Sequence, residues 1–215
     1  MSNDYETGVG QRLFENRIVY LSGDVTTASA DFVVSRILTL DSIDHHAEIK
    51  LYISSFGGGV YPGLAIYDAI QMVEAPVATF CIGPAFSMAA WLLAAGEPGR
   101  RFATPNSRIM LHQTSGGMMG TSSDVRVAAE NMLKNERLMT EMLAHHCKRS
   151  VEEVARAIER DLWMAPDEAR AFGVIDTIAE FCPRKRIPMP MSYAEAVLAN
   201  VGKACLAASH PSNES

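Results

Sequence analysis

The sequence lacks closely spaced cysteines. Its 215 residues include 4 cysteines: Cys81, Cys147, Cys182 and Cys205. No two of them form a C-x-x-C motif, and both a disulfide framework and a structural zinc site need short, regular spacings, so we expect reduced thiols. The run His145, His146 and Cys147 holds possible ligands. Consecutive residues on a helix point in different directions, however, and we expect no metal site.

Long apolar runs and a basic leader are also missing. The apolar run at residues 89–95 ends at Gly96, far short of the roughly 20 residues that span a bilayer. Residues 1–8 carry Asp4 and Glu6 instead of a basic region that leads into an apolar segment, so the sequence predicts no secretory signal. We therefore expect a soluble, cytoplasmic protein without membrane contact.

The chain has no excess of positive charge either. It contains 19 Lys and Arg against 25 Asp and Glu, for a formal net charge of -6 at pH 7. Attraction to a phosphate backbone needs a basic surface, so we do not expect nucleic-acid binding. With 48% hydrophobic and 20% charged residues, the composition is typical of a globular protein and excludes a disordered one.

What is present is a regular alternation of strand and helix signals. Short apolar, β-branched segments precede segments with apolar residues at helical spacing, and N-cap residues such as Thr26 and Ser150 mark helix starts. We interpret residues 57–59 as the break after one strand and Pro84 as the turn after the next. The predicted strands are 17–22, 48–54, 76–83, 108–113 and 174–179. The predicted helices begin at or near Thr27, Pro62, Ser87, Ser123, Ser150 and Pro166.

This alternation predicts the fold class. Strands that are too apolar to leave either face open to water, joined by helices, indicate an α/β protein with a mostly parallel sheet. The predicted organisation is a short N-terminal segment at residues 1–16, one domain at residues 17–180 and a C-terminal extension at residues 181–215. In the extension, a proline-spaced basic linker at 183–191 precedes a weak helix at 192–208, and we expect this tail to be mobile.

Candidate catalytic residues fall at the carboxyl ends of the predicted strands. Parallel sheets bind their ligands at this edge, and three unusual features meet there: the glycines at residues 57–59, Ser87 and His112. Ser87 precedes a predicted helix, whose free N–H groups suit a nucleophile with an oxyanionic intermediate. Serine is also a preferred N-cap residue, and the G-x-S-x-G motif is absent, so a plain capping role for Ser87 stays open.

His112 is a candidate base for Ser87. A neutral imidazole takes the hydroxyl proton during attack and returns it to the leaving amine, provided that a carboxylate holds its tautomer. A buried, hydrogen-bonded histidine without a catalytic role is the alternative. Spacing alone does not select the carboxylate. The candidates are Asp68, Asp124, Asp161 and Asp176.

The glycines at residues 57–59 suggest three roles. The sequence contains neither G-x-G-x-x-G nor G-x-x-x-x-G-K-[ST], so nucleotide binding is not favoured. A tight turn is the structural alternative. The remaining role is an oxyanion hole, in which a glycine N–H approaches the reacting carbonyl without a Cβ in the way.

Three segments together resemble one known family. They are SSFGGGV (54–60), IGPAFSM (82–88) and PNSRIMLHQ (105–113). In residues and spacing they resemble the proteolytic subunit of the Clp protease, ClpP, and the resemblance extends over residues 11–179. It implies a ClpP/crotonase-like fold of repeated β-α-β units, with a long protruding helix and a strand segment at residues 113–123 for contact between rings.

The resemblance also implies an activity and its residues. Ser87 would be the nucleophile of a serine endopeptidase, His112 the general base and Asp161 the orienting carboxylate, with the N–H groups of Gly58 and Met88 as the oxyanion hole. Such subunits form two stacked heptameric rings, a tetradecamer that serves protein quality control by cleaving unfolded proteins fed by a hexameric AAA+ Clp ATPase. We expect no cofactor in this chain, because ATP is used by that partner and no Walker motif occurs here.

Two aromatic residues depart from the family's usual pattern. Phe56 stands where the family has proline, and Phe86 directly precedes the nucleophile where the family has alanine. We expect the Phe86 ring to be a core residue beneath the following helix, with a narrowed substrate groove as the alternative. The departures leave a second hypothesis, a non-catalytic or partner-dependent structural subunit of a heteromeric ClpP ring. A third, an enoyl-CoA hydratase relative of similar fold, needs no Ser-His-Asp set.

Overall fold

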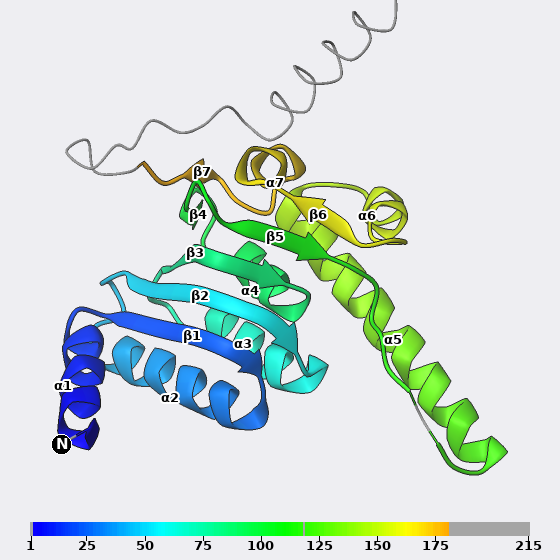
Figure 1. Ribbon diagram of the computed structural model, residues 1–215, viewed down its shortest axis with the longest axis horizontal. Coiled ribbons are helices and arrows are strands. Elements are labelled where there is room, and N and C mark those ends of the chain that lie inside the picture. Colours follow the sequence, from blue (N-terminus) through cyan, green and yellow to red (C-terminus); the bar gives the residue numbers. More distant parts are fainter. Residues whose placement is uncertain (1, 118, 181–215) are drawn as a thin grey trace, which may run out of the picture. The chain divides into compact units, whose positions relative to one another are not determined.

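The structure is a computed structural model, and it describes residues 2–117 and 119–180. Our predictions for the extension at 181–215, with its linker at 183–191 and helix at 192–208, lie outside these residues. The elements, labelled in Figure 1, are α1 (Ser2–Glu15), β1 (Ile18–Val25), α2 (Thr27–Ile43), β2 (Ile49–Gly58), α3 (Val60–Met72), β3 (Val77–Phe86), α4 (Met88–Ala94), β4 (Arg101–Ala103), β5 (Arg108–Leu111), α5 (Ser122–Cys147), α6 (Val151–Ala157), β6 (Leu162–Met164), α7 (Pro166–Phe172) and β7 (Thr177–Ile178).

The strands form one mostly parallel sheet. Strands β1, β2, β3, β4 and β7 lie side by side in this order, and each neighbouring pair is parallel. Strand β5 continues the sheet beside the end of β3, where residues 84–86 pair with residues 108–110, and β6 pairs antiparallel with β5. The predicted α/β class with a mostly parallel sheet is confirmed.

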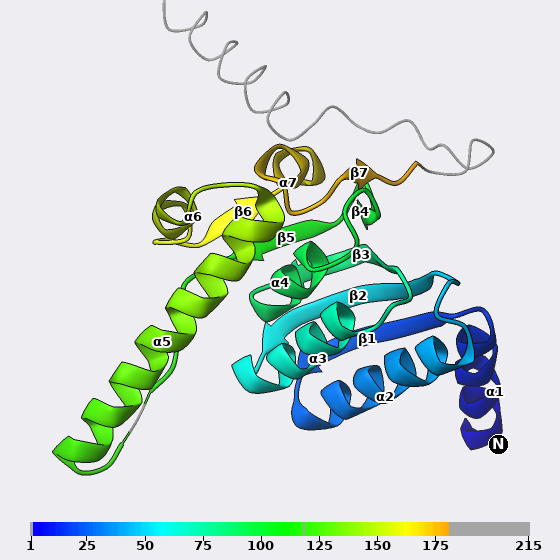
Figure 2. The same ribbon diagram turned by 180° about the vertical axis from the view of Figure 1, so that it is seen from behind.

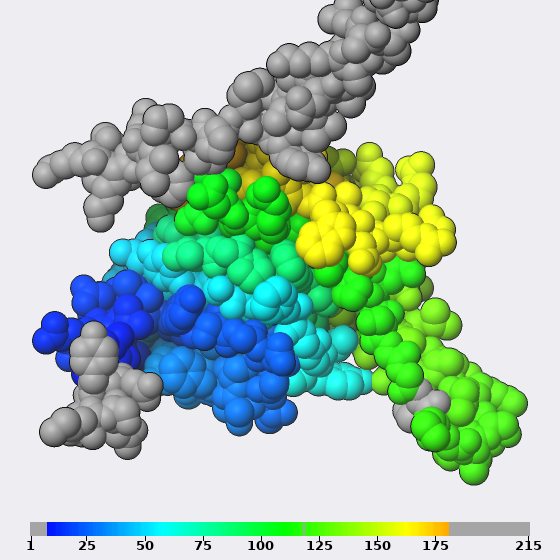
Figure 3. All heavy atoms as spheres, viewed as in Figure 1, coloured from blue at the N-terminus to red at the C-terminus, as the bar shows by residue number. Residues whose placement is uncertain are grey.

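Helices α2, α3 and α4 lie on one face of this sheet, as two opposite views show (Figures 1 and 2). Leu51 and Ile53 of β2 are fully buried, whereas Tyr52 and Phe56 alternate with them and point to the other face. No helix of the described residues covers that face, which is turned to the viewer in Figure 3. Our expectation that neither face is open to water is therefore wrong for the single chain. Helices α2, α3 and α4 connect parallel strands that follow chain order, and right-handed crossovers of this kind place all three on one side.

The core lies between the sheet and this helix layer, and it is aliphatic. Its largest fully buried side chains are Leu21, Ile37, Leu40, Ile49, Leu51, Ile53, Ile66, Leu92, Leu93, Ile109, Leu111 and Leu143. The open face carries aromatic rings instead. Tyr52, Phe80 and Phe102 stack across β2, β3 and β4 with 4.7 Å between successive ring centroids. Contiguous apolar surface of this kind is typical of an interaction face.

Strand β3 runs through the position where the sequence predicts a turn. Pro84 lies inside β3, at a bulge that interrupts its pairing with β2. Proline has no N–H for a strand ladder, and a bulge leaves a residue unpaired, so the bulge accommodates Pro84. Gly83 has a φ of +82° at the same bend, a conformation that glycine adopts without strain. The predicted turn at Pro84 is thus a bulge within one longer strand.

Other boundaries differ from prediction for local reasons. Strand β2 continues to Gly58 instead of ending before the glycines, and α3 begins at Val60, ahead of Pro62. Strands β4 and β6 were not predicted, because each has 3 residues, too few to display a periodic pattern. Helix α1, whose sequence contains two glycines and few apolar residues, was not predicted either.

Helix α5 has 26 residues, and its buried side chains all lie in its C-terminal part. It begins with a capping box in which the Thr121 hydroxyl accepts the N–H of Asp124 and the Asp124 carboxylate accepts the N–H of Thr121. Its C-terminal part packs against α4 and α6, and Trp91 Nε1 donates to the Met139 carbonyl at 2.9 Å. Its N-terminal part extends away from the sheet (Figures 1 and 2). This is the protruding helix that the resemblance implies.

The C-terminal turn of α5 carries a partly buried histidine. His146 Nε2 lies 2.9 Å from the hydroxyl oxygen of Tyr67 on α3. Burial, with smaller contributions from the charges of His145 and Arg101, lowers the pKa of His146 to about 4. The unfolded chain has an ordinary histidine pKa near 6.5. At a pH between these two pKa values, the imidazole is therefore neutral in the folded chain and protonated in the unfolded chain.

We expect acid to destabilise the fold through His146. Between about pH 6.5 and about pH 4 the unfolded chain binds more protons than the folded chain, so stability falls as the pH drops through this window. A loss on the order of 1 kcal/mol at pH 4.5 is expected, because partial exposure screens the group. Urea unfolding at about pH 6.5 and at pH 4.5 measures this loss of stability. The loss should vanish in His146→Gln and persist in His45→Gln, which replaces an exposed histidine. If His146→Gln lost as much stability as the wild type, His146 would be excluded as the source.

Candidate active site

Ser87 lies between β3 and α4, at the N-cap position of the helix. Its φ of +51° and ψ of -133° fall in a region that non-glycine residues rarely occupy. Its N–H donates to the carbonyl of Met110 at 2.8 Å, which fastens this turn to β5. The side chain makes no capping hydrogen bond, unlike Ser150, whose hydroxyl caps α6. A plain capping role therefore does not describe Ser87.

The Ser87 hydroxyl contacts His112 instead. Ser87 Oγ lies 2.8 Å from His112 Nε2. His112 directly follows β5, and β5 pairs with the end of β3, so the strand pairing brings both side chains to one edge of the sheet. A hydroxyl at this distance from an imidazole nitrogen can transfer its proton to the ring.

Among the four aspartates that spacing leaves open, Asp161 is the one beside His112. Asp161 Oδ1 lies 4.0 Å from His112 Nδ1, longer than a hydrogen bond, and sites without substrate often show such loose contacts. The other three lie elsewhere: Asp124 in the cap of α5, Asp176 beside Arg101, and Asp68 on the exposed surface of α3. The structure thus brings Ser87, His112 and Asp161 together.

Gly57 and Gly58 approach their neighbours too closely for any side chain. A Cβ on Gly57, whose φ is +96°, would lie 2.7 Å from the Ser87 Cβ. A Cβ on Gly58, whose φ is +153°, would lie 2.4 Å from the carbonyl oxygen of Val25. Both positions therefore require glycine. The segment is a close backbone approach to the turn that carries Ser87.

Alanine at Gly57 should displace Ser87. Its Cβ would overlap Ser87 and the carbonyl of Phe86, both at 2.7 Å, and would sit at a left-handed φ. We expect a loss of about 1–3 kcal/mol in the free energy of unfolding and at least about tenfold slower peptide hydrolysis. Gly23→Ala is the matched control, because Gly23 has a φ of +73° but no atom within 4 Å of an added Cβ. If both variants lost activity equally, close packing against Ser87 would not be the cause.

A small cavity of about 50 Å³ lies beside Ser87 and His112. Gly58 and Met88, which the resemblance assigns to the oxyanion hole, both line it. Met88 is the first residue of α4, and a first-turn N–H has no acceptor within its own helix. The cavity therefore adjoins Ser87, His112 and the backbone of Gly58 and Met88.

The segment after His112 borders two larger hollows as well as this cavity. Residues 114 and 115 line all three. One hollow, of about 430 Å³, extends to Asp161, and the other, of about 410 Å³, runs along α5 and includes Val60 and Tyr61. No sequence pattern singles out Tyr61, because an aromatic residue at a helix start carries no signal of function. Both hollows therefore adjoin the cavity beside Ser87 and His112 through residues 114 and 115.

Contrary to our expectation, Phe86 does not lie beneath α4. Its ring is only partly buried and contacts Phe56 and Trp163, with 5.5 and 5.0 Å between ring centroids. Side chains alternate along a strand, and Ala85 points into the core, so Phe86 points to the open face. The prediction of a core position is wrong for this reason. Trp163, two residues after Asp161, was not singled out from the sequence.

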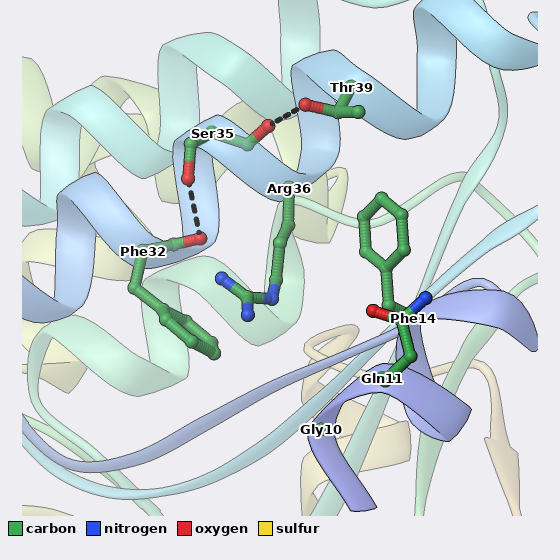
Figure 4. A pocket seen from close by; sticks show the side chains of 7 residues that line it. All are labelled: Gly10, Gln11, Phe14, Phe32, Ser35, Arg36 and Thr39. Atoms are coloured by element: carbon green, nitrogen blue, oxygen red, sulfur yellow. Dashed lines mark hydrogen bonds between the residues drawn. The ribbon is translucent and has the colours of Figure 1, made fainter. Parts of the chain in front are cut away.

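Another hollow, of about 540 Å³, lies between α1 and α2 (Figure 4). The Arg36 guanidinium lies over the Phe32 ring, 3.4 Å from its centroid, and Phe14 adds a second ring. The hydroxyls of Ser35 and Thr39 donate to carbonyls of α2 itself. The described residues that line this hollow include no acid, histidine or cysteine. It therefore offers no acid–base or nucleophilic chemistry.

Two cysteines lie within the part of the chain that the structure describes. Cys81 and Cys147 are free and buried, and burial raises the pKa of Cys81 to about 11 and that of Cys147 to about 12, so both thiols are unreactive at neutral pH. Within residues 2–117 and 119–180 no group of three or more His, Cys, Asp and Glu is placed to hold a metal ion. None of the described helices combines the length and apolarity needed to cross a membrane.

A serine hydrogen-bonded to a histidine, with an aspartate nearby, is an arrangement typical of serine-type hydrolases. Comparison with models of protein families identifies the family, since residues 2–181 match the Clp protease family. The match covers most of the chain, and the chain belongs to this family. The resemblance found in the sequence is confirmed. The family implies a peptidase that forms oligomeric rings and works with a Clp ATPase.

Proposed function

We propose that this protein is the serine endopeptidase subunit of an ATP-dependent Clp protease, which hydrolyses unfolded proteins to short peptides through Ser87, His112 and Asp161. Family membership supports a peptidase. One observation carries the serine-type assignment: Ser87 occupies an N-cap position without capping the helix, and its Oγ lies 2.8 Å from His112 Nε2.

In the proposed reaction, Ser87 Oγ attacks the carbonyl carbon of the scissile peptide bond. His112 Nε2 accepts the hydroxyl proton as the new C–O bond forms. The proton then passes to the leaving amine, the C–N bond breaks, and an acyl-enzyme remains on Ser87. Water, deprotonated by the neutral His112, hydrolyses this ester, and the proton returns to the serine oxygen as the second product leaves.

The N–H groups of Gly58 and Met88 are proposed to stabilise the oxyanion of each tetrahedral intermediate. Both residues line the cavity beside Ser87, and Gly58 has no Cβ to obstruct a carbonyl. Met88 begins α4, where unpaired N–H groups favour negative charge. Every proposed step uses side chains and backbone of this chain, so we propose no cofactor for it.

Asp161 is proposed to hold His112 in the tautomer that carries hydrogen on Nδ1. Nε2 is then free to accept the serine proton, and the carboxylate stabilises the imidazolium that forms. Asp161 Oδ1 lies 4.0 Å from His112 Nδ1. Asp161 therefore needs to approach by about 1 Å to accept a hydrogen bond from the Nδ1–H group.

We expect Asp161→Asn to lower kcat for peptide hydrolysis by at least about a hundredfold. An amide neither selects this tautomer nor stabilises an imidazolium. Asp167→Asn, at an exposed acid on α7, is the matched control and should retain kcat. Steady-state kinetics on one fluorogenic peptide compares the three proteins. An unchanged kcat in Asp161→Asn would remove Asp161 from the reaction.

We propose that the chain assembles, with itself or with a related subunit, into two stacked heptameric rings, and that a hexameric AAA+ Clp ATPase supplies unfolded substrate and hydrolyses ATP. The family supports rings and a Clp ATPase in general. The open apolar face of the sheet and the extended part of α5 are available for such contacts. The free thiols of Cys81 and Cys147 support a reducing compartment, and we place the protein in the cytoplasm.

A second candidate is a non-catalytic or partner-dependent subunit of a heteromeric ring. The 4.0 Å separation between Asp161 and His112 favours it, because the single chain leaves this contact unmade. Peptide hydrolysis by the purified homo-oligomer separates the two candidates. Activity of the chain alone supports the first, and activity that arises only after a related subunit is added supports the second.

A further inference from the structure

Three aromatic rings form an exposed patch beside the Ser–His pair. This aromatic patch consists of Phe56, Phe86 and Trp163. The rings of Phe56 and Phe86 meet at 67° with centroids 5.5 Å apart, and those of Phe86 and Trp163 meet at 77° with centroids 5.0 Å apart. Phe56 is 66% exposed and Trp163 is 54% exposed. A contiguous group of large exposed rings is typical of a binding surface.

Strand pairing holds the patch in place. Phe86 pairs with Met110 between β3 and β5, and Met110 pairs with Trp163 between β5 and β6. Phe86 and Trp163 lie on strands to either side of Met110. Neighbouring strands lie about 4.8 Å apart, so the backbones of Phe86 and Trp163 are separated by about twice this distance. A ring separation of 5.0 Å therefore means that the two side chains lean toward each other over Met110. The patch belongs to the sheet and not to a loose loop.

Each ring of the aromatic patch also stands within two residues of a proposed catalytic group. The central ring directly precedes Ser87. The outer rings, Phe56 and Trp163, are two residues from Gly58 and Asp161. The patch is therefore tied by the chain itself to the turn that carries Ser87 and to the segments of Gly58 and Asp161.

The position of His112 indicates which half of the substrate meets the patch. Met110, over which the rings meet, and His112 are two residues apart, so their side chains lie on the same side of the chain. His112 delivers a proton to the leaving amine, and the segment that carries this amine must pass close to it. The acyl segment has the hollow that includes Val60 and Tyr61 along α5.

We propose that the aromatic patch binds a bulky apolar side chain at the first residue of the leaving segment and thereby sets the cleavage preference. This inference rests on the proposed peptidase function. A phenylalanine or leucine side chain that lies on the patch removes both itself and the exposed rings from water, and an aromatic one adds edge-to-face contacts. An alanine leaves the rings exposed. We expect at least about tenfold discrimination in kcat/KM.

The test uses the full-length chain and two quenched peptides that differ only in the first residue after the scissile bond, phenylalanine or alanine. Mass spectrometry of the products verifies the cleavage position. The wild type should prefer phenylalanine by at least about tenfold, and Phe86→Ala should reduce this ratio by about tenfold. Trp163→Ala, on the exposed side of β6, is a second variant and should act in the same direction. Tyr20→Ala removes a ring that is 42% exposed on β1 of the same face and should leave the ratio unchanged.

Trp163 also reports on binding without any turnover. The chain has 2 tryptophans, and Trp91 is only 4% exposed, so solvent-sensitive emission comes from Trp163. The phenylalanine peptide, added to Ser87→Ala, should shift this emission to shorter wavelength, and the shift should be absent in Ser87→Ala with Trp163→Phe. No shift at concentrations that saturate the wild type would overturn the proposal.

The outcomes separate this inference from the proposed function. If a fluorophosphonate labels Ser87 but neither Phe86→Ala nor Trp163→Ala changes the ratio, the peptidase stands and the aromatic patch is no subsite. If these variants change the native mass of the assembly and leave the ratio intact, the patch binds a second copy of the chain, which overturns the proposal. If Ser87 is not labelled in the assembled wild type, the proposed function and this inference both fail.

Discussion

Replacing Ser87 with alanine should lower kcat for peptide hydrolysis by about 10⁴-fold or more. The variant lacks the oxygen on which we propose that the acyl-enzyme forms, and it leaves His112 no hydroxyl from which to take a proton. The loss should come without a loss of stability, because the Ser87 side chain caps no helix and its one hydrogen-bond partner is the imidazole. We expect the free energy of unfolding to change by less than about 0.5 kcal/mol.

Ser150→Ala is the matched control for Ser87→Ala. Ser150 is a true N-cap, whose hydroxyl accepts the N–H of Glu153 at 3.2 Å. Its loss should cost about 1 kcal/mol in urea unfolding and leave kcat intact. The two serines should therefore show opposite behaviour. Retained hydrolysis in Ser87→Ala, together with a capping-sized loss of stability, would return Ser87 to a purely structural role.

Breaking the ion pair between Arg101 and Asp176 should have the largest effect on stability. The Arg101 side chain is only 7% exposed, and its Nε donates to Asp176 Oδ2 at 2.9 Å. Its Nη1 donates to carbonyls at the C-terminal ends of three helices, α4, α5 and α7: Ala94, His146 and Gly173. One guanidinium therefore fastens three helices to the sheet, at the helix ends where a positive charge is favourable.

We expect Asp176→Ala and Arg101→Met each to lower the free energy of unfolding by about 3–5 kcal/mol. Asp176→Ala leaves the buried charge of Arg101 without its partner, and Arg101→Met leaves the Asp176 carboxylate and the three carbonyl groups without theirs. Urea unfolding at pH 7 measures the loss. Arg100→Met is the matched control: the Arg100 and Glu48 side chains are 47% and 30% exposed, so this pair should contribute less than about 1 kcal/mol. Similar losses in all three variants would contradict the anchoring role of Arg101.

The same ion pair has a pH signature. Burial raises the pKa of Asp176, but the hydrogen bonds and charge of Arg101 outweigh burial, and the pKa lies below its usual value. The stabilisation is present above about pH 4, where the unfolded carboxyl ionises, and is lost as the pH falls toward the lower folded pKa. This window lies below that of His146, so the two groups can be resolved in one pH series.

The fold class and the edge that carries the site could be predicted because they leave local traces. Alternating strand and helix patterns imply a parallel sheet, and parallel strands bring their carboxyl ends together, which places Ser87 near His112. Asp161 leaves no such trace. Its position depends on the pairing of β6 with β5, a contact between segments far apart in the chain that involves only 3 residues of β6. Spacing therefore left four aspartates open, and only the family resemblance singled out Asp161.

Errors in our predictions have equally specific causes. A proline normally ends a strand, which predicts a turn at Pro84, but a bulge in the sheet accommodates it. Buried aromatic rings are common, which predicts a core position for Phe86, but the strand period turns its ring to the open face. The aromatic patch depends on strand register across β3, β5 and β6. Register is set by long-range pairing, which a single sequence does not reveal.

The central claim is that Ser87 is an activated nucleophile. The most direct test is the intact mass of the assembled protein before and after reaction with a fluorophosphonate. We expect one adduct per chain, absent in Ser87→Ala and present in Ser150→Ala. No adduct on the folded, assembled wild type, or an adduct that persists in Ser87→Ala, would contradict the account.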